Sequence, residues 1–143
     1  SKALELLAKL HDEMNLFVSD LHKTYPTDER VMRLVKGIEK MKIEEAPNDD
    51  GSSYTINKGE LMALCLRHKK GDHPFHDYNT LQFVMIHELA HIASVSEGHN
   101  QEFINNFRFL LRQANTLGYY EPVNYSHAPI YYCGIKVTNN PFY

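Results

Sequence analysis

The run from Asn79 to Phe109 constrains this chain more than any other part of its sequence. A helix that is apolar on nearly every side is a buried helix. The first half of the run has this character, with Leu81, Phe83, Val84, Met85, Ile86, Leu89, Ala90, Ile92 and Ala93. His87, Glu88 and His91 interrupt the apolar residues, and burying such groups without a partner is costly. The predicted helix therefore needs a partner that offsets the free-energy cost of burying these three side chains.

The spacing of the two histidines predicts that the compensating partner is a metal ion. Residues four apart on an α-helix lie one turn above each other, so His87 and His91 would present their imidazoles on one face. Gly98 permits a sharp turn that brings His99 back as a third ligand. Catalytic zinc typically has three protein ligands and a water. We therefore predict that His87, His91 and His99 bind Zn²⁺.

Glu88 is the predicted catalytic residue. It follows the first ligand directly, so its carboxylate can lean over the open coordination position without occupying it. There it can take a proton from a zinc-bound water. Glu102 is expected to orient His99 or His87 through a hydrogen bond. His73 and His76 could compete for the metal, but their loop context favours His99.

These residues resemble the zincin metalloproteases of the WLM and SprT-like kind. His87, Glu88, His91 and His99 match the three ligands and the general base of that family. Three further stretches carry the resemblance: Gly98-His99 with Glu102-Phe103, Asn57-Lys58-Gly59, and Leu64-Cys65-Leu66-Arg67. The first is similar to the end of the SprT-like pattern. The other two look like the strand pair before the active-site helix of WLM domains. The resemblance covers about Tyr54 to Leu117.

The resemblance implies an α+β, zincin-like fold in which helices pack on a small sheet and one helix carries the two-histidine motif. It also implies a zinc endopeptidase acting on protein substrates, among them proteins crosslinked to DNA or tagged by a small modifier. Two alternatives remain open. One is a non-catalytic zinc-binding module for protein interaction, although a structural site more often closes its fourth position with Cys or His. The other is a zinc hydrolase of a non-peptide amide, since the same activated water serves both substrates.

Two helices are predicted before the motif. From Lys2 to Thr24, apolar residues recur at three- and four-residue steps, which indicates an amphipathic helix packed on a core. Tyr25-Pro26 ends this helix, and a second, shorter helix is predicted through Ile38. After His99, a further amphipathic helix carries Phe103 to Leu111.

Strands and loops are predicted around the motif. Residues 43–53 are polar and turn-rich, which favours a loop, and their acidic residues lack the spacing of a calcium loop. Residues 54–57 and 61–67 are predicted as two strands joined by a tight turn. The apolar strand 61–67 is the expected sheet edge for an extended substrate. After Gly118, tyrosines and prolines indicate irregular structure with short extended pieces. One of these tyrosines, or His127, is a candidate donor to a developing oxyanion.

Length and charge limit the partners. A chain of 143 residues with 43% hydrophobic residues fits a single domain, residues 1–143, and its start at Ser1 is consistent with a piece of a longer protein. A net charge of −3 argues against a broad basic face for nucleic acid. Contact with DNA is therefore left to the basic cluster Arg67 to Lys70, which is more simply a solvated loop, or to regions outside this chain.

The predicted location is intracellular, nuclear or cytoplasmic, and not secreted. No apolar run approaches the roughly 20 residues that cross a bilayer, and the start lacks a signal-like segment, so no membrane partner is expected. Two cysteines give no disulfide framework. Cys65 lies in an apolar run that favours a buried thiol, which is consistent with a reducing compartment.

Overall fold

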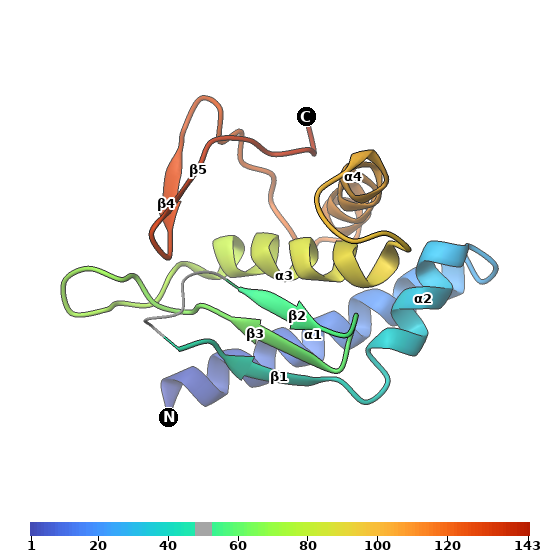
Figure 1. Cartoon of the computed structure of the whole chain (residues 1–143), viewed down its shortest axis with the longest axis horizontal. Helices are drawn as coiled ribbons and strands as arrows, with labels where there is room; N and C mark the ends of the chain where they lie inside the picture. The colour runs from blue at the N-terminus through green and yellow to red at the C-terminus, as the bar shows by residue number, and fades with distance from the viewer. Residues whose placement is uncertain (48–52) are drawn as a thin grey trace.

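The computed structural model describes residues 1–47 and 53–143, with helices and small sheets combined in an α+β arrangement (Figure 1). In chain order the elements are α1 (Lys2–Thr24), α2 (Glu29–Gly37), β1 (Lys42–Glu45), β2 (Tyr54–Ile56), β3 (Leu61–Leu64), α3 (Tyr78–Ala93), α4 (Gln101–Thr116), β4 (Ile130–Tyr132) and β5 (Ile135–Val137). The α+β class is the predicted one.

The two N-terminal helices form where the sequence predicts them. Helix α1 buries one stripe, Leu7, Leu10, Met14, Phe17, Val18 and Leu21. Helix α2 begins after Asp28, whose side chain accepts hydrogen bonds from the backbone N–H groups of Arg30 and Val31. Such a cap satisfies donors that the first helical turn leaves unpaired. The structure thus confirms both helices that the sequence predicts here.

The three-stranded sheet has the order β1-β3-β2, which corrects the prediction that the strand in 61–67 is a sheet edge. Strands β2 and β3 form the predicted antiparallel hairpin, but β3 lies in the centre of the sheet rather than at its edge. Its apolar run Met62, Ala63, Leu64 is almost fully buried, as a strand covered on both faces requires. Strand β2, with β1, is therefore an edge of this sheet.

Strand β1 occupies part of the segment that was predicted to be a loop. It pairs in parallel with β3, with Lys42 opposite Leu61 and Glu45 opposite Leu64. Charged residues dominate β1, so its sequence hides the alternation of a strand, and pairing with the buried β3 decides the outcome. The remaining acidic residues, considered above for calcium, lie mostly in 48–52, outside the described residues.

Helix α3 is the buried centre of the molecule, as predicted. Most of its side chains are buried, on every side of the helix. It packs between the three-stranded sheet and α4, and α2 contacts it as well (Figure 1). A helix fixed on so many sides holds its side chains in defined positions, which suits a site that depends on spacing.

Cys65 and Cys133 form a disulfide, which contradicts the prediction of a buried free thiol at Cys65. Cys65 is buried as expected, but the turn between β4 and β5 brings Cys133 beside it from 68 residues away. A local sequence pattern cannot report such a long-range pairing. The expectation of a reducing compartment rested on free thiols and loses that support. Within the described parts of the chain, no helix has the length and apolar character that crossing a membrane requires.

Candidate metal centre and active site

Three local structures place the predicted metal ligands. Helix α3 begins at its cap Asp77, whose side chain accepts from the Thr80 N–H, and runs unbroken past His87 and His91. Gly98 has a φ of +83°, a conformation that glycine adopts without strain. Helix α4 starts after Asn100, whose side chain caps it by accepting from the Phe103 N–H. His99 therefore projects from a short turn between two fixed helix ends.

The three histidine rings form a nearly equilateral triangle. Their centroids are 5.0 Å apart for His87 and His91, 5.1 Å for His87 and His99, and 5.0 Å for His91 and His99. Three imidazoles on one tetrahedral zinc, with Zn–N bonds of about 2.0–2.1 Å, would have centroids about 5.2 Å apart. One ring nitrogen of each histidine lies within 4.8 Å of the others. The donor set thus has the size and composition that a zinc ion requires.

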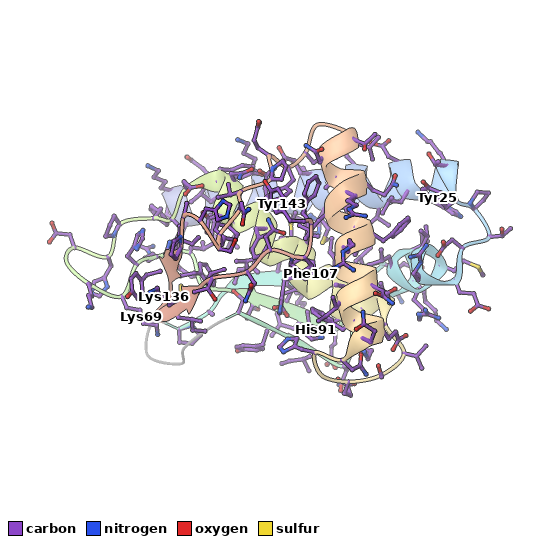
Figure 2. All side chains as sticks on the ribbon, turned by 90° about the horizontal axis from the view of Figure 1, so that it is seen from above. Tyr25, Lys69, His91, Phe107, Lys136 and Tyr143 are labelled. Atoms are coloured by element: carbon purple, nitrogen blue, oxygen red, sulfur yellow. A yellow bond between two sulfur atoms is a disulfide. The ribbon has the colours of Figure 1, made fainter. Side chains whose placement is uncertain are left out.

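Phe103 forms the floor of this triangle. Its ring centroid lies 5.1 Å from that of His87, 4.3 Å from His91 and 4.8 Å from His99. Phe103 is buried, whereas His99 is exposed and the other two histidines are partly exposed. Figure 2 shows His91 and Phe107 on the same side of α4, toward the hairpin that carries Lys136. The cluster is therefore closed on one side by an aromatic ring and open on the other.

The environment keeps His91 and His99 in the form that binds metal. Burial, together with the neighbouring His87 as a smaller cause, lowers the pKa of His91 to about 4. Burial and His87 also lower the pKa of His99. Both shifts disfavour the protonated ring, so His91 and His99 are neutral at neutral pH. Neutral imidazole is the metal-binding form of histidine.

Glu88 lies beside the cluster and is 2% exposed. Its Oε2 is 2.8 Å from Nδ1 of His87. A hydrogen bond donated by Nδ1–H to this carboxylate leaves Nε2 of His87 as the ligand atom. Glu88 is therefore positioned both to orient a ligand and to accept a proton next to the open side of the cluster.

Two hollows meet at these residues. One has a volume of about 450 Å³ and is mainly apolar, with walls that include Phe83, Phe107, Ile135 and Val137. The other, also about 450 Å³, runs beside β2 and includes Tyr54, Thr55, Asn57 and Lys58. His87, Glu88 and His99 line both hollows. The cluster thus lies between a sheet edge and an apolar chamber.

Lys58 binds the C-terminal end of α3 and the loop that leads to His99, a role that the sequence analysis did not predict. Its Nζ donates to the carbonyl oxygens of His91 (2.8 Å), Ser94 (2.8 Å) and Ser96 (2.9 Å). A cation at the carboxyl end of a helix is favourable because the helix leaves unpaired carbonyls there. The contact joins the β2–β3 turn to the end of α3 across 33 residues of sequence, so no local pattern could indicate it.

Glu102 holds the loop between α3 and α4 rather than an imidazole ring. Its carboxylate accepts from the N–H groups of Val95 (2.9 Å) and Ser96 (3.0 Å), and from the Ser96 hydroxyl. The Ser96 hydroxyl and these N–H groups lower the pKa of Glu102 to about 2. The expected bond to His99 or His87 is replaced by this capping of the loop, which the sequence pattern could not distinguish.

The remaining sequence candidates lie elsewhere or are engaged. His76 groups with Cys65 and Cys133, and His73 contacts the His68 carbonyl. Arg67 of the basic cluster pairs with Glu45 at 2.7 Å. Two candidates for oxyanion donation are occupied: the Tyr132 hydroxyl donates to the Cys65 carbonyl at 2.6 Å, and His127 contacts Asn124. Tyr132 nevertheless lines the apolar hollow.

Comparison with known proteins identifies the family. Similar curated proteins, all uncharacterised, come from three viruses: Acanthamoeba polyphaga mimivirus (37% identity over 66% of this chain and 47% of the relative), invertebrate iridescent virus 6 (43% identity, 57% and 43%) and invertebrate iridescent virus 3 (40% identity, 52% and 45%). The chain spans less than half the length of these relatives. No solved structure gives a significant match. Residues 51–129 match the model of the WLM domain, and the chain belongs to the WLM domain family.

Proposed function

We propose that this chain is a zinc-dependent endopeptidase. One observation carries the proposal: a triangle of imidazoles of zinc-binding size lies beside a buried carboxylate, where two hollows meet. Membership of the WLM family supports a protease. The open side of the cluster argues against a purely structural site, because such sites are closed.

The proposed ligands are His87, His91 and His99. Bound zinc would polarise the scissile carbonyl and acidify a water molecule. Glu88 would take the proton of that water and deliver it to the leaving amine. The burial of Glu88 keeps bulk water from solvating its carboxylate, and Lys58 with Glu102 holds the segment that carries His99.

The proposed substrate is an extended stretch of protein. Strand β2 is an edge of the described sheet, and Tyr54 and Thr55 line the hollow next to the cluster. An extended peptide can add to such an edge through backbone hydrogen bonds, which recognise shape more than sequence. The apolar hollow beyond Glu88 would then receive an apolar side chain of the substrate.

Proteins crosslinked to DNA or tagged by a small modifier are the substrates that the resemblance implies. A net charge of −3 leaves the DNA contact to a local cluster or to parts outside this chain. We propose a nuclear or cytoplasmic location for this activity.

The test is zinc analysis combined with cleavage of a denatured protein mixture, with and without DNA. We expect stoichiometric zinc and cleavage that stops when a chelator removes the metal. Stoichiometric zinc without cleavage under either condition favours the interaction module. A zinc hydrolase of non-peptide amides would instead hydrolyse small amides while leaving proteins intact.

A further inference from the structure

A second cluster of metal-binding atoms lies near the N-terminal end of α3. Cys65, His76 and Cys133 each offer one ligand atom, and these atoms lie within 4.8 Å of one another. The three residues are 0%, 5% and 3% exposed. They are distinct from the histidine cluster, because His76 precedes the cap of α3 at its N-terminal end, whereas His87 and His91 lie toward its C-terminal end.

Backbone hydrogen bonds hold Cys65 and His76 next to each other. The His76 N–H donates to the Leu66 carbonyl at 2.9 Å, and the His68 N–H donates to the Pro74 carbonyl at 2.8 Å. These bonds join the two ends of the loop after β3, so that Cys65 and His76 stay adjacent. Cys133 lies in the tight turn between β4 and β5, with a φ of +48°.

Among the described residues, the buried ring of His76 has no strong hydrogen-bonding partner. Its Nε2 lies 3.4 Å from Sγ of Cys133, and sulfur is a weak acceptor. Buried polar groups normally have good partners, so a ring aimed at a sulfur pair calls for an explanation. Cysteine sulfur and imidazole nitrogen are the ligand types that zinc has in closed, structural sites.

We propose that, when the disulfide is reduced, Cys65, His76 and Cys133 bind a second zinc ion with a structural role. His68 is the candidate for the fourth ligand, since it follows Cys65 by three residues. Its ring centroid lies 3.8 Å from that of His76, so the His68 ring would have to turn away from His76 to bind the same ion. Two sulfurs on one zinc would be about 3.8 Å apart, given Zn–S bonds of about 2.3 Å. The two cysteine Cα atoms are 6.4 Å apart, and side-chain rotation can supply that separation.

The two states exchange through balanced chemistry. Reduction of the S–S bond takes two electrons and two protons from a thiol reductant, which becomes its own disulfide. The two thiols then lose their protons to solvent as their sulfurs coordinate zinc. The disulfide and the zinc ion are thus alternative clamps between the same two segments.

The clamp holds part of the proposed active site. Ile135 and Val137 follow Cys133 in the hairpin and line the apolar hollow, and Tyr132 precedes it. The hairpin lies beyond residues 51–129, the part of the chain that matches the family. Under this proposal, metal or disulfide keeps a wall of the hollow in place whichever redox state prevails.

Titration of the full chain with Co²⁺ tests the proposal, because cobalt bound to thiolate gives a near-ultraviolet charge-transfer band that histidine sites lack. Reduced, metal-free protein, titrated without oxygen, should bind two equivalents, one of which produces this band. Oxidised protein should bind one equivalent without the band. Reduced protein that binds a single equivalent and shows no thiolate band would overturn the proposal.

Variants assign the band to its ligands. Cys65→Ser, Cys133→Ser and His76→Ala should each abolish the band and keep the other equivalent, with folding checked by circular dichroism. His73→Ala, a histidine of the same loop outside the cluster, should keep both equivalents. His91→Ala should keep the band and lose the other equivalent, which makes the outcome independent of the proposed protease. A band that persists in Cys133→Ser would contradict the assignment.

Discussion

The two clusters associated with α3 differ in exposure as well as in the atoms they offer, which are three imidazole nitrogens in one and two sulfurs with one imidazole nitrogen in the other. The histidine cluster has one exposed and two partly exposed members, whereas Cys65, His76 and Cys133 are all buried. Zinc sites follow the same division, since catalytic sites keep one position open and structural sites are closed. The same helix thus supports one cluster that a substrate can reach and one that it cannot. Exposure, more than ligand spacing, separates the expected roles.

The largest expected effect tests whether the open cluster is catalytic. Glu88→Gln keeps the size of the side chain but removes the proton acceptor, so cleavage should fall by about 10²–10⁴ with zinc retained. Rates of protein cleavage and zinc content of the purified variants measure this. Glu44→Gln, on an exposed position of β1, is the matched control and should leave both unchanged. A Glu88→Gln protein that cleaves as fast as the parent would remove the distinction between the two clusters.

Three further histidine variants compare the two clusters directly. His76→Ala removes a fully enclosed ring and should lower the free energy of unfolding by about 2–3 kcal/mol. His91→Ala and His99→Ala should instead lower zinc binding strongly at the open cluster, with a smaller effect on the metal-free protein. Chemical denaturation and metal analysis give the two readouts, and His22→Ala, an exposed histidine of α1, serves as the control. The comparison fails if His99→Ala keeps stoichiometric zinc with unchanged affinity.

Lys58→Met sharpens the comparison at the support of the open cluster. The variant keeps an apolar stem but loses three hydrogen bonds to the carbonyls of His91, Ser94 and Ser96. We expect zinc affinity to fall roughly tenfold, as for other groups that hold metal ligands in place. Competition with a zinc-binding dye measures the affinity. Lys40→Met, on an exposed lysine, should have no effect, and an equal loss in both variants would point to net charge instead.

The smallest expected effect is a pH dependence at Glu102. Its pKa is lowered from 4.5 to about 2 in the folded protein, so its carboxylate stabilises the fold above about pH 4.5. That contribution is lost as the pH falls from about 4.5 to about 2. The thermal midpoint of metal-free Glu102→Gln should therefore lie below that of the parent at neutral pH and converge with it in acid. Glu39→Gln, at an exposed position, should show no such convergence. A constant difference across this range would mean that charge at Glu102 is not what holds the loop.

The elements that were predicted correctly are those that local periodicity defines. Helices α1 and α4 follow three- and four-residue steps of apolar side chains, α3 follows a run that is apolar on nearly every side, and the hairpin of β2 and β3 follows its turn. The structure also brings together the three histidines that the motif singled out, although their role as zinc ligands stays a prediction. These features depend on residues within about one helical turn or one loop of each other.

The features that were missed depend on long-range contacts. Strand β1 exists because β3 pairs with it, and Cys65 loses its thiol to a residue 68 positions away. Lys58 binds the end of a helix that begins 20 residues later in the chain, which no spacing rule covers. The central position of β3 was inferable from its uninterrupted apolar run, which is typical of strands buried on both faces.

The disulfide between Cys65 and Cys133 closes a covalent loop of the chain, and this loop contains the residues of the proposed active site. Helices α3 and α4, with all three candidate ligands and Glu88, lie between these two cysteines, which are 68 positions apart in the sequence. On the chain-entropy description, a loop of this length removes about 4 kcal/mol of conformational freedom from the unfolded chain. A backbone cut anywhere inside the loop would leave the two pieces joined. The disulfide thus keeps the proposed active-site residues covalently connected even after a single backbone cleavage between Cys65 and Cys133.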